Sequence, residues 1–391
     1  MILGAVVGGI FGDTLGPLSQ LSKLIVQWIK ILATPLLFFA ILDGILNGQM
    51  KGRGVRAMLL ISAFNALCAI SIALFISNTF HAGQYLQLKA GAAVVESAKK
   101  NWDWTEAVKT FIPDSLIGPF VNNAVPALIL LAILFGIAGR VLEAHATPPE
   151  KEVYEHARHS LQLLMKILLK VMEWFIYLVP LAVFASVAKV VGEHGFSILG
   201  GLGAYLAVTL SGMFLQVVFV YQFWIRGIAR KSLGLFWREA REPMFYSFGV
   251  NSSLATLPVT LKALDRVGVS SGAARLSACV GTNLNNDGIL LYEVVAAFFI
   301  AQAYGIHLSV FQQVALAGIC VLATIGVAGI PEAGIISLLL VLNTANLPAE
   351  SLPLLLTVDW IVARFRSVTN VLADMTVAVG IDHFSAPQPA Q

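Results

Sequence analysis

Long, unbroken runs of apolar residues alternate with polar breaks along this chain. Most runs are long enough to cross a bilayer, which takes roughly 20 residues of helix. Because the runs are continuous rather than alternating, the pattern favours helices over a membrane barrel. It predicts an all-α polytopic membrane protein with eight transmembrane helices, in the cell (inner) membrane. The predicted spans lie near 1–11, 18–46, 57–80, 115–142, 160–190, 197–225, 272–303 and 354–381.

Two further apolar stretches are interrupted in their middle. One lies at about 236–264 and contains VNSSLATLP; the other lies at about 309–347 and contains IGVAGIPEAG. Each has two apolar arms around a tip of small residues with a proline. Since non-helical backbone at membrane depth must be buried in protein or line a cavity, we predict two re-entrant helical hairpins. Interrupted helices of this kind point to a transporter binding site, whereas ordinary kinked helices are the alternative.

The composition agrees with a membrane protein. Hydrophobic residues make up 58% of the chain and charged residues 12%, against about a quarter charged in soluble proteins. The N-terminal stretch has no basic region and no cleavage site, so we expect a membrane helix there and not a cleavable signal. The three cysteines are scattered singly, which predicts neither a disulfide nor a metal site. Nothing in the charge pattern supports nucleic-acid binding.

Lysines and arginines follow the even-numbered spans, which predicts that those loops are cytoplasmic. One of these polar breaks is EAHATPPEKEVYEHARH, residues 143–159. The polar stretch 81–110 mixes both signs of charge and would be external. We expect both stretches to be polar breaks between membrane segments.

The stretch NLNNDGILLYE places polar residues in a strongly apolar region. On a helix, Asn283, Asn286 and Asp287 fall within one turn, with Asn285 and Gly288 alongside. An ionised aspartate in lipid costs at least a few kcal/mol, so it must face the protein interior and have a partner. A cation held by carboxylate and amide oxygens would be such a partner. Gly288 would loosen the helix and free backbone carbonyls.

The last span, DWIVARFRSVTNVLAD, repeats this pattern with a positive charge. Arg366, Asn370 and Asp374 are spaced i, i+4, i+8 and share one helix face. An arginine at membrane depth needs an anion, and its planar fork binds a carboxylate bidentately. The residues therefore predict a carboxylate receptor beside a cation receptor. An internal Arg–Asp ion pair that holds two helices together is the alternative.

Four motifs resemble the dicarboxylate/amino acid:cation symporter family, which includes the glutamate transporters. SSLATLP resembles the tip of the first hairpin, and TNLNNDGILLYE resembles the broken seventh helix. ATIGVAGIPEAG resembles the tip of the second hairpin, and DWIVARFRSVTNVLAD resembles the eighth helix. The resemblance implies a homotrimer and an elevator-type transporter fold, in which a mobile transport domain carries substrate past a fixed scaffold.

The resemblance also implies a division of the chain. Scaffold helices would occupy 1–56 and 115–195, and an extracellular loop 82–114. The transport domain would comprise 57–81 and 196–381, and the C-terminal tail would be 382–391.

The family's site residues carry over by position. Substrate contacts would come from Arg366, Asn370, Ser252, Ser253, Gly329, Asp359, Ala363 and Ser367. Three cation sites are implied. One would be formed by Gly281, Asn285, Asn370 and Asp374, a second by Asn285 and Asp287 with Asn286 beside them, and a third by the backbone of Thr324, Ile325 and Val327. Asp287 and Asp374 would be the carboxylate ligands. The resemblance implies no cofactor other than sodium ions or protons as coupling ions.

Several positions depart from the family's pattern. Ala363 stands where the amino-acid carriers keep an aspartate for the substrate's amino group. This favours a dicarboxylate such as succinate, fumarate or malate, although Asp359 could reach an amino group and keeps aspartate and glutamate open. Asn65 and Ala66 occupy positions of the third helix where hydroxyls for a sodium site are expected. The usual sodium stoichiometry is therefore in question.

Two glutamates are candidate proton carriers. Glu293 matches a position that carries a proton in the proton-coupled glutamate transporters, and Glu332 adds a titratable group to the second hairpin tip. Burial would raise the pKa of either side chain. A carboxyl group hydrogen-bonded within the bundle is the alternative for Glu293.

The function predicted from these residues is cation-coupled symport of a small dicarboxylate or acidic amino acid. An anion-conducting channel of the same fold and a neutral amino acid carrier are the alternatives. An intramembrane enzyme is disfavoured, because the chain has no HExxH motif and no paired acidic metal motif.

Overall fold

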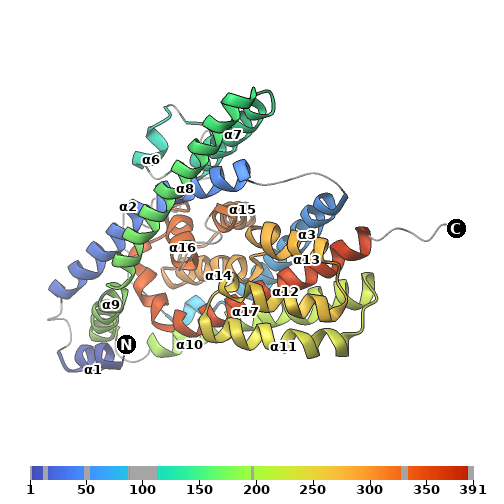
Figure 1. Ribbon diagram of the computed structural model, residues 1–391. Helices are drawn as coiled ribbons and strands as arrows, with labels where there is room; N and C mark the ends of the chain where they lie inside the picture. The colour runs from blue at the N-terminus through green and yellow to red at the C-terminus, as the bar shows by residue number, and fades with distance from the viewer. Residues whose placement is uncertain are drawn as a thin grey trace. The chain divides into compact units, whose positions relative to one another are not determined.

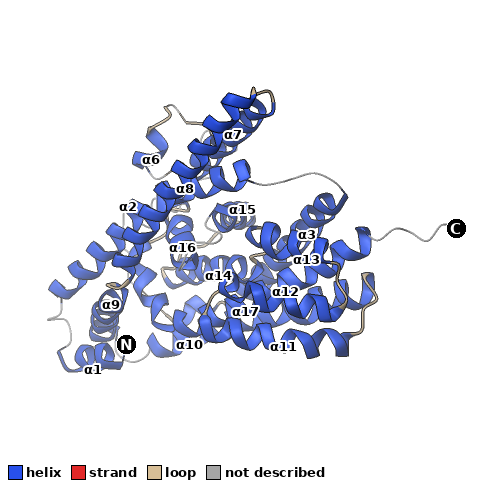
Figure 2. Cartoon of the chain, in the orientation of Figure 1, coloured by secondary structure: helices blue, strands red, loops and turns tan. Residues whose placement is uncertain are grey.

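The computed structural model describes residues 2–11, 16–47, 53–86, 88, 112–113, 115–122, 124–194, 198–326 and 333–385. These residues form helices and connecting loops, with no strand among them (Figure 2), as the sequence predicts. The chain divides into two compact units. The first unit comprises Met1–Gly48, His81–Tyr205 and Ala296–Val358, and the second comprises Gln49–Phe80, Leu206–Val295 and Asp359–Gln391. The scaffold and transport domains implied by the resemblance stay a prediction.

Three of the described helices are long and apolar enough to cross a membrane. They are Arg53–Phe80, Ala127–Ala144 and Gly200–Ile228. They correspond to the predicted spans near 57–80, 115–142 and 197–225. The total of eight spans and the re-entry of the hairpins stay predictions.

In the first unit, α2 packs against α7, α8 and α9, and α1 packs against α9 (Figure 1). Leu36 and Leu37 of α2 and Leu128 of α7 are fully buried among apolar neighbours. The helices are α1 (Ile2–Phe11), α2 (Gly16–Asn47), α6 (Gly118–Asn122), α7 (Val125–Ala144), α8 (Pro148–Ile176) and α9 (Val179–His194), with a 3₁₀ turn at Ala82–Tyr85.

The polar stretch 143–159 does separate two helices, α7 and α8, but the break itself is only residues 145–147 and the rest of the stretch is helical. Helix α8 begins at Pro148, a residue whose fixed φ suits a first helical position. The Thr147 side chain and Glu150 form a capping box there. These hydrogen bonds from Thr147 hold the pKa of Glu150 below its usual value. The predicted span 160–190 is also divided by a turn after Ile176, so α8 and α9 are found where one helix was expected.

The second predicted hairpin lies in the first unit. Its arms are α15 (Val310–Gly326) and α16 (Ala333–Thr344), which pack against each other and against α2. Neither arm contains a charged residue. The predicted tip, residues 327–332, lies outside the described residues, so the arms alone are seen.

The first predicted hairpin lies in the second unit and begins slightly earlier than expected. Its arms are α11 (Leu233–Val250) and α12 (Ser253–Val267), which pack side by side (Figure 1). At the tip, Asn251 adopts a left-handed conformation with φ of 52°. Ser252 then caps α12 by accepting a hydrogen bond from the Ala255 backbone N–H at 3.2 Å. Two residues thus reverse the chain.

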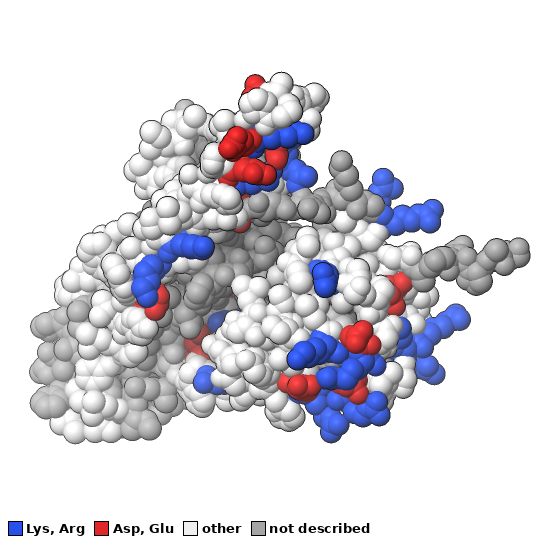
Figure 3. Space-filling model, in the orientation of Figure 1, with Lys and Arg blue, Asp and Glu red and all other residues white. Residues whose placement is uncertain are grey.

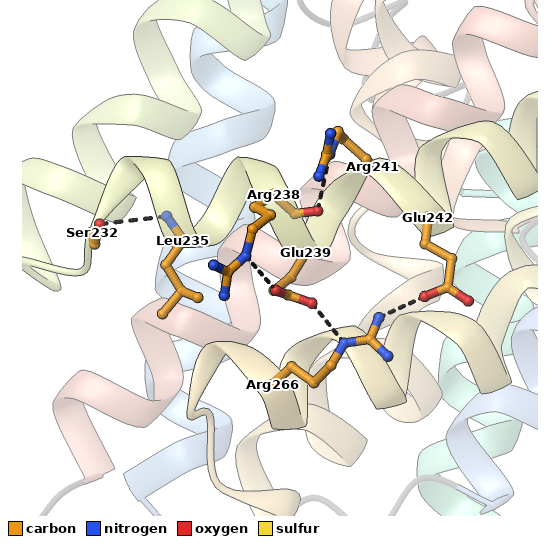
Figure 4. Close-up of polar contacts among 7 residues, drawn as sticks. All are labelled: Ser232, Leu235, Arg238, Glu239, Arg241, Glu242 and Arg266. Atoms are coloured by element: carbon orange, nitrogen blue, oxygen red, sulfur yellow. Dashed lines mark hydrogen bonds and ion pairs between the residues drawn. The ribbon is translucent and has the colours of Figure 1, made fainter.

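The two arms of this hairpin are joined by ion pairs far from the tip (Figure 4). Arg266 of α12 contacts Glu239 and Glu242 of α11, each at 2.6 Å, and Arg238 also contacts Glu239. In Figure 3 charged side chains gather over α11 and α12. Exposed ion pairs add little stability, but here they connect both arms through one guanidinium.

The core of the second unit is built from the helices that carry the predicted site. Buried side chains of α3, α11, α12 and α17 meet there, among them Ile61, Phe236 and Met375. Helix α10 continues into two π-helical segments, a form that frequently occurs at functional sites. The elements that lie wholly or partly in this unit are α3 (Arg53–Phe80), α10 (Ile198–Leu215), the π-helical Gln216–Tyr221 and Phe223–Ile228, α13 (Ser271–Arg275), the π-helical Leu276–Val280, the 3₁₀ turn Gly281–Asn283, α14 (Asp287–Ala303) and α17 (Leu352–Ser385). The 3₁₀ turn Ala349–Ser351 belongs to the first unit.

Candidate functional site

The predicted span at 272–303 is broken in front of Asp287. Regular α-helix ends at Arg275 and resumes at Asp287. Between them, Gly281 lies against α3, where a Cβ would be 2.6 Å from the sulfur of the flexible Met58 side chain. The break therefore lies at residues 276–286, and the expectation that Gly288 loosens the helix was wrong.

Gly288 instead brings α14 close to α17. A Cβ at this position would lie 2.6 Å from the backbone oxygen of Arg366. The Gly288 backbone N–H donates a hydrogen bond to Asn370 Oδ1 at 2.9 Å. The first turn of α14 and the predicted carboxylate receptor on α17 are thus in direct contact.

Asp374 lies in a buried cluster of amide and hydroxyl groups. Thr282 Oγ1 donates to Asp374 Oδ2, and Asn285 Nδ2 donates to Asp374 Oδ1, both at 3.0 Å. Ser277 Oγ donates to the Asp374 backbone oxygen at 2.7 Å and lies 3.3 Å from Asn285 Nδ2. The broken segment thus supplies the predicted Asn285, together with Thr282 and Ser277, which sequence reasoning missed.

Ser62 completes this cluster from α3. Its hydroxyl donates to Asn285 Oδ1 at 2.6 Å, and its side chain is buried. The third helix therefore does bring a hydroxyl to the site, three residues before the position at which one was expected. We call Ser62, Ser277, Thr282, Asn285 and Asp374 the Asp374 cluster.

Asp287 lies in a second buried cluster with different partners. Gln216 Nε2 donates to Asp287 Oδ2 at 3.1 Å, and the Tyr221 hydroxyl donates to the same oxygen at 2.9 Å. Gln216 Nε2 also donates to the backbone oxygen of Asn65 at 3.1 Å, and Trp224 Nε1 donates to Asn65 Oδ1 at 2.7 Å. We call these residues the Asp287 cluster.

Both groups that donate to Asp287 come from one π-helical segment, Gln216–Tyr221. Its wider turn places two residues five positions apart on one carboxylate oxygen. The sequence offered one signal, a glutamine within the predicted span 197–225. Its apolar neighbours make this polar residue easy to overlook. Asn65, the predicted third-helix position, contributes its backbone oxygen and not a hydroxyl.

Arg366 is buried in α17 and pairs within its own helix. Its Nη1 lies 3.1 Å from Asp359 Oδ1, and its guanidinium carbon lies 4.4 Å from the centre of the Tyr292 ring. A cation over an aromatic face is attracted to it. The Arg–Asp pair considered from the sequence thus exists, but it joins one helix to itself rather than two helices.

The tip of the first hairpin contacts the same helix. The Ser367 hydroxyl donates to Asn251 Oδ1 at 3.1 Å. The predicted Ser252 and Ser253 follow directly, as the cap and first residue of α12. The structure therefore brings this tip beside the helix that carries Arg366.

The remaining predicted residues are found in several places. Ala363 of α17 and Asn286 and Glu293 on either side of Asp287 are buried in the second unit. Thr324 and Ile325 lie at the end of α15 in the first unit. Val327, Gly329 and Glu332 lie outside the described residues.

The described residues contain no group of three or more His, Cys, Asp or Glu side chains that could hold a metal ion. Both clusters consist of single carboxylates surrounded by amide, hydroxyl and backbone oxygens. Such donors suit hard monovalent or divalent cations rather than transition metals.

These features define a class of protein. Apolar helices, a helix broken at buried polar residues and a buried arginine beside them are typical of secondary transporters. The chain belongs to the sodium:dicarboxylate symporter family, whose model matches residues 1–384. It is accordingly an integral membrane protein and a transporter by family.

Individual relatives are distant but span the chain. A C4-dicarboxylate transport protein 3 of Ralstonia nicotianae is 26% identical over 97% of this chain and 86% of its own length. A C4-dicarboxylate transport protein of Laribacter hongkongensis is 27% identical, with the same coverage of 97% and 86%. A proton/sodium-glutamate symport protein of Bacillus subtilis is 26% identical over 97% of this chain and 89% of its own length.

Proposed function

We propose that this protein is a symporter that moves a small dicarboxylate across the membrane together with sodium ions or protons. The observation that carries the proposal is the position of Arg366. It is buried in α17, one helical turn before Asn370 and two turns before Asp374. A buried guanidinium beside a buried carboxylate cluster offers one site for an anion and another for a cation.

A substrate carboxylate is the anion that fits Arg366. The guanidinium has five N–H donors in a planar fork, so a substrate carboxylate can join or replace Asp359 as its partner. The Tyr292 ring lies against the guanidinium and helps to fix the orientation of the guanidinium plane. Asn370, whose carboxamide is fixed by the Gly288 N–H, would contact the rest of the substrate.

The choice of a dicarboxylate over an amino acid rests on Ala363. This buried methyl group cannot pair with an ammonium, and burying an unpaired ammonium is costly. Two of the three relatives described above are named for C4-dicarboxylates and one for glutamate. Asp359 already pairs with Arg366, so an ammonium there would compete with the guanidinium.

Coupling follows from the charges. A dicarboxylate brings two negative charges into the protein, and Arg366 provides one positive charge. A cation in the Asp374 cluster would neutralise Asp374 and lower the cost of burying the second carboxylate. Because binding free energies are reciprocal, cation and substrate would each raise the affinity for the other. Glu293, fully buried beside Tyr292, is the candidate carrier if a proton is moved.

We also propose the homotrimeric, elevator-type arrangement that the resemblance implies. In this arrangement the second hairpin closes over the loaded site. Its arms contain no charged residue, so movement within the membrane would not expose charge to lipid. Gly329 at the tip of this hairpin would contact the substrate, and Glu332 in the same tip is the second candidate proton carrier.

The test is uptake into proteoliposomes with two matched arginine variants. Arg366→Ala should abolish uptake of labelled succinate. Arg364→Ala is the control, because Arg364 lies on the same helix and binds the backbone oxygen of Trp360. Wild-type uptake should require an imposed sodium or proton gradient. Wild-type rates in Arg366→Ala, or uptake that ignores both gradients, would contradict the proposal.

The substrate is identified by thermal stabilisation. Succinate, fumarate, malate, aspartate and glutamate would each be added with and without sodium at two pH values. We expect the dicarboxylates to stabilise the wild-type protein and Arg364→Ala, but not Arg366→Ala. Stabilisation by aspartate or glutamate alone would reverse the substrate preference inferred from Ala363.

A further inference from the structure

The side-chain amide of Gln216 connects two oxygens that carry no hydrogen. Its Nε2 donates to the backbone oxygen of Asn65 and to Asp287 Oδ2, both at 3.1 Å. Gln216 is fully buried, and Asn65 and Asp287 are each 1% exposed. One NH₂ group with two hydrogens therefore joins α3 to the first residue of α14 deep inside the second unit.

A backbone carbonyl oxygen and a carboxylate oxygen on two different elements are the ligands that a hard cation takes in proteins. The N–H dipoles of Gln216 present positive charge to the same two oxygens. We propose that the Gln216 amide takes the place of a coupling cation at Asp287, so that coupled sodium binds at the Asp374 cluster and not at Asp287. This inference rests on the proposed function, and it argues against the second cation that the resemblance implies at Asn285 and Asp287.

The surroundings keep the amide in this orientation. If it turned over, its Oε1 would face a carbonyl oxygen and a carboxylate oxygen, which repel it. Gln216 Oε1 is buried and makes no hydrogen bond with any described residue, so only the two Nε2 contacts select the orientation. Asn65 is held in turn by Trp224 Nε1, which can only donate.

Two further groups stabilise Asp287 as an anion without a cation. The Tyr221 hydroxyl donates to Oδ2 at 2.9 Å. Asp287 is also the first residue of α14, where the helix dipole favours negative charge. A cation arriving at Oδ2 would have to displace both donors. The Oδ2 oxygen of Asp287 is therefore already satisfied by the protein.

Counting bound sodium tests the inference without any substrate. For a ligand that binds only the folded state, the slope of stability against the logarithm of its concentration gives the number bound. Thermal unfolding of the purified full chain would be followed over a range of sodium at constant ionic strength. The variants are Gln216→Lys, which retains a donor and adds a permanent positive charge, and Gln216→Ala, which removes the donor. Gln222→Ala is the control, because its amide bonds Val217 and Trp237 and not Asp287.

We expect Gln216→Lys and Gln222→Ala to bind as many sodium ions as the wild type, and Gln216→Ala to bind one more. A Gln216→Ala protein that folds only with sodium would support the inference in the same way. The loss of one sodium ion in Gln216→Lys would overturn it, because lysine would then have displaced a cation. An unchanged count in a folded Gln216→Ala would overturn it too.

The outcomes also separate this inference from the proposed function. Dicarboxylate uptake by the wild type that does not depend on sodium would show that sodium is not the coupling ion. The gain of a sodium site in Gln216→Ala would still stand as evidence for the amide's role. Conversely, failed dicarboxylate binding would not alter the sodium counts.

Discussion

Asp287 and Asp374 are two buried aspartates of the same unit whose partners differ in kind. Asp374 is 3% exposed and Asp287 1%, so burial does not distinguish them. Asp374 is contacted by Thr282 and Asn285, and Asn285 also contacts the hydroxyls of Ser62 and Ser277. Asp287 is contacted by Gln216, whose NH₂ lies between two acceptors, and by Tyr221.

The difference is that the Asp374 cluster can exchange donors for acceptors. A hydroxyl donates one hydrogen and also accepts, so Ser62 can change from donor to acceptor toward Asn285. The Asn285 amide can then turn over, with Nδ2 donating to Ser62 and Oδ1 facing the space beside Asp374. Thr282 can likewise present its oxygen. A cation could thus be received by rotations alone, whereas Gln216 has no partner that could reverse its role.

The largest effect is expected from Asp374→Asn. Removing one partner of a buried charge pair costs about 2–5 kcal/mol, so the sodium affinity should fall by roughly 100-fold. The measurement is the sodium concentration that gives half of the maximal thermal stabilisation. An unchanged value would mean that the coupling cation binds elsewhere, and the comparison would lose its basis.

A smaller effect is expected from Ser62→Ala. When Asn285 turns over, its Nδ2 would have no acceptor, and an unsatisfied buried donor costs about 1–3 kcal/mol. The sodium affinity should therefore fall by roughly tenfold. Ser71→Ala is the matched control on α3, because the Ser71 hydroxyl is exposed and bonds only the Leu67 backbone oxygen.

Equal sodium affinities in Ser62→Ala and Ser71→Ala would show that sodium can bind without an exchange of donor and acceptor roles in the hydroxyl network. The Asp374 cluster would then differ from the Asp287 cluster in composition but not in adaptability. A loss in both variants would point to a general weakening of α3.

The sequence identifies the two carboxylates but not what surrounds them. Asp287, Asp374 and Arg366 stand out because a charge in an apolar span demands a partner. The helix break is also predicted, but it was placed at Gly288 and in fact lies before Asp287. Glycine is needed at position 288 for the close contact with the Arg366 backbone, and not for a break in the helix. These features come from the residue's own chemistry and its immediate neighbours.

The partners from other helices could not be predicted in this way. Ser62 and Gln216 reach the site only through the packing of α3 and of the π-helical segment, and π-helical turns leave no periodic signal. Asn65 stands where the third helix was expected to carry a hydroxyl group. The hydroxyl group at the site comes instead from Ser62, one helical turn earlier. The break within 143–159 is only three residues long for a local reason, since the Thr147 capping box starts a helix that the polar composition does not reveal.

The smallest effect on sodium is expected from Asp287→Asn. The new amide keeps an oxygen where Oδ2 lies, so Gln216 and Tyr221 can still donate to it. Because no cation has to bind there, the half-saturating sodium concentration should change by less than about threefold, which is below 1 kcal/mol. Half-maximal thermal stabilisation by sodium, measured beside Asp374→Asn, gives the contrast directly. If Asp287→Asn lost sodium as strongly as Asp374→Asn, both aspartates would hold cations, and the amide of Gln216 could not be a substitute for one of them.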